Sequence, residues 1–194
     1  MIRLRAVLVP LSTRLARAQR FPAAREALAE ALRASAELAG APRSLPCEDW
    51  PRAASGAPAA VAGWHASFAD TTGLAAALVA PLPVGLDAEW LHRRRWEAAR
   101  ERFRASGELA LLAADDAAAV LALWTAKEAL LKLAGIGLAD LARCHLLHRD
   151  GELFRLEHRG REHEVHVRTA GEHVLACASA APVELVLHAL EPVA

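Results

Sequence analysis

The sequence predicts an α+β protein made of two similar lobes, each a helix followed by an antiparallel sheet. Helical periodicity over residues 14–40 is followed by short strand-like segments between residues 64 and 90, and the same order of elements recurs in the second half. The 194 residues, 54% of them hydrophobic, are enough to form two cores. We therefore expect an N-terminal lobe over residues 1–90 and a C-terminal lobe over residues 91–194.

The first half begins with an apolar segment, residues 2–9, that predicts a strand. An arginine-rich start of this kind also resembles an organelle transit peptide, but the short apolar run favours the strand. Leu28, Leu32 and Ala36 then recur at helical spacing, and Gly40 is a normal residue at which a helix ends.

Residues 41–63 contain four prolines with Ser and Gly between them, which predicts an irregular segment. Three short apolar runs follow at residues 64–68, 74–79 and 84–90, separated by residues typical of turns. These runs predict the strands of the first lobe.

The second half repeats this order. Helical patterns over residues 96–113 and 115–135 precede a segment, residues 144–179, in which strand-like runs alternate with turns. This alternation predicts an antiparallel meander. The turns are Asp150-Gly151, Arg159-Gly160 and Ala170-Gly171.

Charge and cysteine content narrow the possible environments and partners. With 23 basic and 23 acidic residues the formal net charge is +0, so we expect neither nucleic acid nor a membrane as partner. Cys47, Cys144 and Cys177 are odd in number and far apart, which fits neither a disulfide framework nor a zinc site. A reducing cytoplasm is the simplest location for such a chain.

Two carboxylates stand together on one predicted strand. Successive side chains of a strand point to opposite faces, so Asp87 and Glu89 lie on the same face as Gly85, which leaves open space beside them. Like charges this close repel each other unless a cation lies between them, and ligands that are all oxygen favour Mg²⁺ over zinc. The alternative is a pair of solvated carboxylates on an edge strand.

A second charged group lies on the predicted helix of residues 115–135. Glu128 and Lys132 are four residues apart and share a helix face, whereas Lys127 is rotated about a hundred degrees aside. Such a pair on a surface is common and is worth only about 0.3 to 0.5 kcal/mol. The neighbouring residues are almost all apolar, however, and partly buried charges need partners.

The segments VGLDAEW and WTAKEALLK, with Arg102-Phe103 and Glu108 between them, resemble the paired signature of the 4′-phosphopantetheinyl transferases. Because 84 residues precede Gly85, the chain is similar to the larger members of this family, which fold as an intramolecular pseudo-dimer. The resemblance therefore implies a site between the two lobes of a monomer.

The resemblance also implies an activity and a set of roles. Asp87, Glu89 and Glu128 would hold Mg²⁺ against the diphosphate of coenzyme A, and Glu128 would act as general base through a water. Lys132 would neutralise phosphate oxygens or assist proton transfer. The reaction would be attack by a serine hydroxyl of an apo acyl or peptidyl carrier protein on the phosphorus next to pantetheine. The residues expected to bind coenzyme A are Ser67, Lys127, Lys132, Arg17 and Arg20.

Several basic residues have an alternative interpretation. Arg14, Arg17, Arg20 and Arg25 recur at spacings near one helical turn, which indicates either a solvated helix face or a clamp for the 3′-phosphate of coenzyme A. Residues 93–95 are three arginines that would attract an acidic carrier protein.

The chain departs from the family pattern at two places. Ser67 is in register with a family serine, but Phe68 stands where the family has histidine, and Gly56-Ala57-Pro58 lacks the family's basic residue. These departures predict weaker binding of coenzyme A. They also leave open a relative that binds carrier protein or coenzyme A without transferring anything. A third possibility, accidental motifs on an unrelated scaffold, would be favoured if Asp87 and Glu128 lay far apart.

Overall fold

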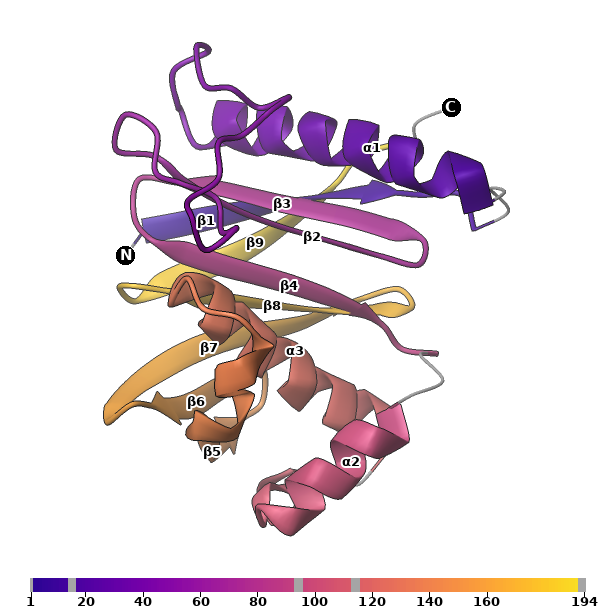
Figure 1. The fold of residues 1–194 in the computed structure, drawn as a ribbon, viewed down its shortest axis with the longest axis vertical. Helices are drawn as coiled ribbons and strands as arrows, with labels where there is room; N and C mark the ends of the chain where they lie inside the picture. Colours follow the sequence, from indigo (N-terminus) through magenta and orange to yellow (C-terminus); the bar gives the residue numbers. More distant parts are fainter. Residues whose placement is uncertain (1, 14–16, 93–95, 113–115, 192–194) are drawn as a thin grey trace.

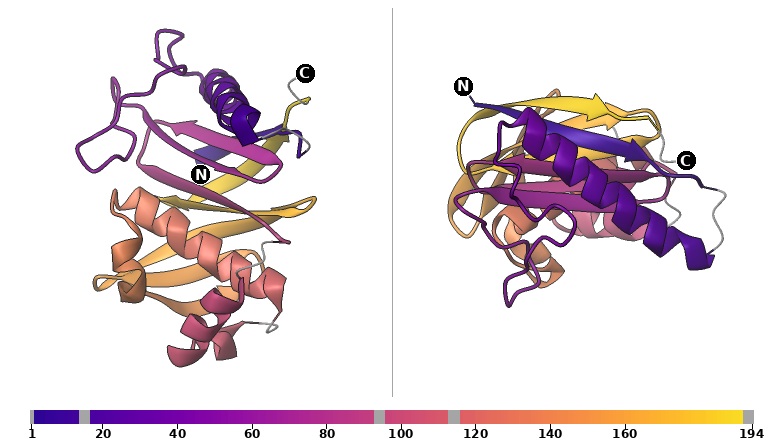
Figure 2. Two further views of the ribbon diagram at one scale, coloured as in Figure 1. Left: turned by 45° about the vertical axis from the view of Figure 1, so that its right-hand side comes forward. Right: turned by 90° about the horizontal axis from the view of Figure 1, so that it is seen from above.

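The computed structural model has four layers in the order helix, sheet, sheet, helix (Figure 1). Helix α1 covers the outer face of the first sheet, and α3 covers the outer face of the second, with α2 beside it (Figure 2). No helix among the described residues is both long and apolar enough to cross a membrane. The structure describes residues 2–13, 17–92, 96–112 and 116–191, with side chains in α1 from residue 21 onward.

The first sheet has four strands in the order β2-β3-β1-β9. Strands β2 and β3 form a hairpin, β1 pairs antiparallel to β3, and β9 pairs parallel to β1. Helix α1 packs on this sheet through small residues, which lets the helix approach the strands closely. The bounds are β1 Ile2–Pro10, α1 Arg17–Leu38, β2 His65–Thr71, β3 Leu74–Ala80 and β9 Val183–Ala189.

The second sheet has five antiparallel strands in the order β4-β8-β7-β6-β5. The predicted meander is confirmed, since β5 to β8 pair in chain order. The bounds are β4 Val84–Trp90, α2 Trp96–Ala105, η1 Glu108–Leu111, α3 Ala117–Leu133, η2 Leu138–Arg143, β5 Cys144–Asp150, β6 Leu153–His158, β7 Arg161–Ala170 and β8 His173–Ser179.

Three apolar clusters fill the spaces between the layers. One lies between α1 and the first sheet, one between the two sheets, and one between the second sheet and helices α2 and α3. On β4, Leu86 and Ala88 belong to the cluster between the sheets, so Asp87 and Glu89 face α3 instead. The alternation predicted for this strand is therefore confirmed: its apolar face packs between the two sheets and its acidic face packs against α3.

The α+β class is confirmed, but two strands cross the expected division at residue 90. Strand β4 precedes that position and pairs with β8 of the second sheet, whereas β9 lies near the end of the chain and pairs with β1 of the first. The predicted helix over residues 96–113 is shorter than expected. It ends at Ala105, because Gly107 takes a left-handed conformation (φ 77) before the 3₁₀ turn of η1.

Candidate active site

Gly85 brings the acidic face of β4 against helix α3. A Cβ atom at this position would lie 2.0 Å from the carbonyl oxygen of Ala129, which is far inside van der Waals contact. Only glycine therefore permits this separation of strand and helix. The close approach places Asp87 and Glu89, which are 4% and 9% exposed, beside the helix that carries Glu128 and Lys132.

Lys132 joins the helix to both sheets. Its Nζ donates hydrogen bonds to Asp87 Oδ1 at 2.8 Å, to the carbonyl of Leu86 at 3.0 Å and to the carbonyl of Phe68 at 3.2 Å. Leu86 lies on β4 and Phe68 on β2, the edge strand of the first sheet. Asp87 and Lys132, expected from the sequence to belong to one site, thus meet at the point where the two sheets come together.

Ser67 of β2 also holds the two sheets together where β2 meets β4. The backbone N–H of Leu86 donates to Ser67 Oγ at 2.7 Å, and the serine is 3% exposed. Because β2 and β4 belong to different sheets, this bond ties the edge of one sheet to the edge of the other. Ser67 therefore has a structural partner, and its expected contact with coenzyme A stays a prediction.

Lys127 lies in the core, away from the ligand-accessible surface. Its Nζ is 2.7 Å from Glu108, and both side chains are almost fully buried. Glu108 also accepts hydrogen bonds from the N–H of Leu146 at 2.6 Å and from Ser106 Oγ at 2.6 Å. The Lys127 ammonium packs over the ring of Phe103 at 4.8 Å. The expected role of Lys127 in binding coenzyme A stays a prediction, and in the structure this amine has a buried carboxylate as its partner.

The remaining predicted site residues differ in how far the structure describes them. Glu128 is half-buried on α3, one residue from the buried Lys127. Within the described residues, no group of three or more His, Cys, Asp or Glu side chains is arranged to hold a metal ion. The side chains of Arg17 and Arg20 lie outside the described part of the chain, as do Arg14 and the three arginines at 93–95.

A hollow of about 270 Å³ opens beside Lys132. It is bounded by Ser67 and Phe68 of β2, by the loop of residues 52–58 and by the turn that follows α3. The Gly56-Ala57-Pro58 segment, compared above with a family motif, forms part of this wall. The hollow is therefore adjacent to the carbonyl and carboxylate oxygens that Lys132 binds.

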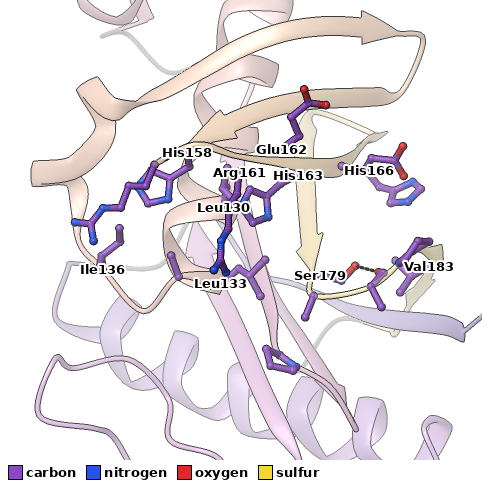
Figure 3. Close-up of a pocket in the computed structure, with 17 residues that line it drawn as sticks. Leu130, Leu133, Ile136, His158, Arg161, Glu162, His163, His166, Ser179 and Val183 are labelled. Carbon is purple, nitrogen blue, oxygen red and sulfur yellow. Dashed lines mark hydrogen bonds between the residues drawn. The ribbon is translucent and has the colours of Figure 1, made fainter.

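A larger cavity of about 720 Å³ is lined by the C-terminal end of α3 and by residues of β7 (Figure 3). Pro83, Leu133 and Ile136 line both this cavity and the hollow beside Lys132, so the two are neighbours. Burial lowers the pKa of His163 and of His166 below the ordinary value of 6.5, which favours the neutral form of both rings.

An acidic group supports the rim of this cavity. Asp140 accepts hydrogen bonds from Arg159 at 2.9 Å and from His158 at 2.7 Å, and both of these residues line the cavity. The hydrogen bond from Arg159, followed by that from His158, lowers the pKa of Asp140 from 3.8 to about 2.

Comparison of the sequence with models of known protein families assigns the chain a family. The sequence model of the 4′-phosphopantetheinyl transferase superfamily matches residues 83–178, from just before β4 to one residue short of the end of β8. The chain carries a domain of the 4′-phosphopantetheinyl transferase superfamily. The matched span includes Asp87, Lys132 and all but the last residue of the second sheet, and it supports a phosphopantetheinyl transferase kind of activity. No curated protein matched the chain.

Two features of this superfamily domain and its surroundings were not expected from the sequence. The Arg-Phe and acidic residues between the motifs were noted, but the pattern did not indicate that Phe103 and Glu108 enclose Lys127. Arg52 was not singled out at all, although its guanidinium lies 5.0 Å above the ring of Phe68. The only signal was its place six residues before Pro58 in a segment rich in turn residues.

Proposed function

We propose that this protein transfers 4′-phosphopantetheine from coenzyme A to a serine of an apo acyl or peptidyl carrier protein. The observation that carries the proposal is the contact between Asp87 and Lys132, 2.8 Å apart, where β4 and α3 meet inside the superfamily domain. A carboxylate and an ammonium beside an open hollow are the charges that a diphosphate substrate and its metal require.

The residues of β4 fit a magnesium ion by their donor chemistry. Asp87 and Glu89 share one face of the strand and offer only oxygen atoms, which Mg²⁺ prefers. We propose that they hold the ion together with Glu128. Lys132 bonds Asp87 Oδ1 here, so this oxygen would bind the metal only after the ammonium releases it. The bound ion would supply charge neutralisation at the diphosphate.

The side chains of the site have distinct proposed tasks. Lys132 would transfer its hydrogen bonds from Asp87 to phosphate oxygens, because a freed ammonium in a half-buried site needs an anionic partner. Glu128 would take the proton of the carrier serine, directly or through a water, as the serine oxygen attacks the phosphorus next to pantetheine. The bond to adenosine 3′,5′-bisphosphate breaks in the same displacement. Positioning and charge neutralisation are the main requirements of such a reaction.

The arrangement of the chain supports the two-lobed form as a proposal. One helix-covered sheet packs against a second helix-covered sheet, and the site residues lie where β2 of the first sheet meets β4 of the second. We propose that this monomeric pseudo-dimer works in the cytoplasm, where its three free cysteines would stay reduced. Arg17 and Arg20 stay candidates for binding coenzyme A.

A second candidate function is binding without transfer. Lys132 is bonded to Asp87, and the described acidic groups form no metal-holding cluster of three, as expected of a relative that has lost the reaction. Such a protein would bind coenzyme A or a carrier protein and leave both unchanged.

Intact-mass measurement separates the two candidates. The protein is incubated with coenzyme A and a panel of apo carrier proteins, with Mg²⁺ or with EDTA. Transfer predicts that at least one carrier gains the mass of one phosphopantetheine group with Mg²⁺ and not with EDTA. If no carrier gains mass while calorimetry detects coenzyme A binding, the non-catalytic function is correct.

A further inference from the structure

Two cations flank Phe68. The Lys132 ammonium donates to the main-chain carbonyl of Phe68 at 3.2 Å, and the Arg52 guanidinium lies over its ring at 5.0 Å. A guanidinium over an aromatic face is held by the ring quadrupole, and its edge N–H groups stay available to a further partner. Phe68 therefore places a second positive charge next to the one already assigned to the site.

Arg52 is held by a structured loop rather than by a flexible one. Its main chain forms a β-bridge with Pro58, and its Nη1 donates to the carbonyl of Gly56 at 2.8 Å. The base of the loop is anchored by the buried Trp50, whose Nε1 donates to the carbonyl of Ala59 at 2.7 Å. These bonds fix the guanidinium in position before any ligand arrives, which lowers the entropy cost of binding.

Arg52 and Phe68 also form the partition between two hollows. The first is the hollow beside Lys132, and the second, of about 320 Å³, lies between α1 and the loop. A ligand that extends from Lys132 past Phe68 would therefore meet Arg52 and then enter the second hollow.

The second hollow has the chemistry of a purine site more than of a phosphate site. Its walls include apolar residues of α1, which suit the flat face of a base. It also has three acidic residues against the cations Arg25 and Arg52, so a phosphate deep inside it would face carboxylates. The apolar residues of α1 are Phe21, Ala24, Leu28, Ala29 and Leu32, and the acidic residues are Glu48, Asp49 and Asp70.

We propose that Arg52, seated on Phe68, binds the 3′-phosphate of coenzyme A, with the adenine in the second hollow. The inference rests on the proposed function, because that function supplies coenzyme A as the ligand whose diphosphate lies at Lys132. It assigns the 3′-phosphate to a residue outside the expected set of Arg17 and Arg20. It also gives Phe68 a role, since the ring supports the cation that the site uses.

The test compares two nucleotides that differ only in the 3′-phosphate. Calorimetry measures the binding of adenosine 3′,5′-bisphosphate and of adenosine 5′-monophosphate, without metal, to the wild type and to variants. Arg52→Ala should weaken bisphosphate binding about 10-fold, the lower end of the range for a charged hydrogen bond, because the guanidinium is exposed. Its monophosphate binding should change less than about 2-fold, because the lost contact is to the 3′-phosphate alone.

Three further variants identify the cause. Arg52→Lys keeps the charge without the planar fork and should restore part of the affinity. Phe68→Leu keeps an apolar side chain without the ring and should cost about 2- to 5-fold, the range of an exposed cation–π contact. Arg43→Ala removes a charge from the same irregular segment, at a residue that lines neither hollow, and should leave both affinities unchanged.

The inference is wrong if the wild type binds both nucleotides equally, if it binds neither, or if Arg52→Ala and Arg43→Ala behave alike. Its failure is distinguishable from failure of the proposed function. Arg52-dependent binding of the bisphosphate without any mass gain on carriers would refute transfer alone. Transfer with bisphosphate binding that ignores Arg52 would refute only the assignment of Arg52.

Discussion

Replacing Lys132 by methionine should destabilise the junction of the two sheets as well as stop the reaction. Methionine retains a flexible, mostly apolar chain of similar length, so the substitution removes mainly the ammonium. Three hydrogen bonds are lost, to Asp87, Leu86 and Phe68. Asp87, which is 4% exposed, is left without this cation.

The size of the loss follows from the burial of the pair. All three bonds are donated by the charged ammonium, and a hydrogen bond that involves a charged group contributes about 1.5 to 3 kcal/mol when it is shielded from solvent. The Lys132 side chain is 34% exposed, so solvent screening reduces the sum. We expect the free energy of unfolding to fall by about 2 to 3 kcal/mol. For a chain of this size each 1 kcal/mol corresponds to about 2 to 4 °C in Tm.

Chemical and thermal denaturation measure this change, with Arg33→Met as the matched control. Arg33 pairs with Glu48 at 3.4 Å, but the two side chains are 59% and 82% exposed. Removing such a surface pair should cost less than about 0.5 kcal/mol. If Lys132→Met is as stable as Arg33→Met, the ammonium does not hold the sheets together and the reasoning is refuted.

Three other substitutions probe separate parts of the structure. Lys127→Met should lower the free energy of unfolding, measured by urea denaturation, by about 3 to 5 kcal/mol, because the buried carboxylate of Glu108 is left without its cation. Adding Glu108→Gln to this variant removes the unpaired charge and should restore part of the lost stability. Gly85→Ala should cost more than about 2 kcal/mol by overpacking against α3, whereas Gly137→Ala, with open space around it, should be near neutral in melting curves. Because the pKa of Asp140 falls from 3.8 to about 2 on folding, its contribution to stability is complete above pH 3.8 and is lost as the pH falls through 2. Asp140→Asn should therefore be less stable than the wild type at pH 7, and the difference should disappear near pH 2; a constant difference would contradict the assigned pKa.

Local patterns in the sequence predicted most of the elements. Alternation along residues 84–90 placed Asp87 and Glu89 on one face, and the turn pairs of the second half gave the meander of β5 to β8. These features depend on neighbours within a few residues of each other, which a single sequence records directly.

Pairing between distant segments was not predictable in the same way. Strand β9 pairs with β1, with Ile2 opposite Val183, and no sequence pattern in either segment indicates that the two strands pair. The helix of residues 96–113 was overextended for a related reason, since Gly107 is compatible with helix until its φ of 77 is known. Such choices are made by tertiary packing rather than by propensity.

In the candidate site too, residues within a local motif could be predicted and contacts between distant segments could not. Asp87, Glu128 and Lys132 could be chosen as candidates because two motifs fix their types and spacing. The contact between Lys127 and Glu108 was not predictable, because Glu108 lies 19 positions earlier and reaches the lysine only through the fold. The seat of Arg52 on Phe68 likewise depends on how the loop closes over β2.

The rate at which an apo carrier protein gains mass tests the central claim most directly. Wild type, Asp87→Asn and the control Asp150→Asn, an exposed carboxylate at the end of β5, are compared with coenzyme A and Mg²⁺. The account predicts that wild type and control add one phosphopantetheine group at similar rates, and that folded Asp87→Asn is at least about 100-fold slower. Equal rates for wild type and Asp87→Asn, or no mass gain with the wild type on any carrier, would contradict it.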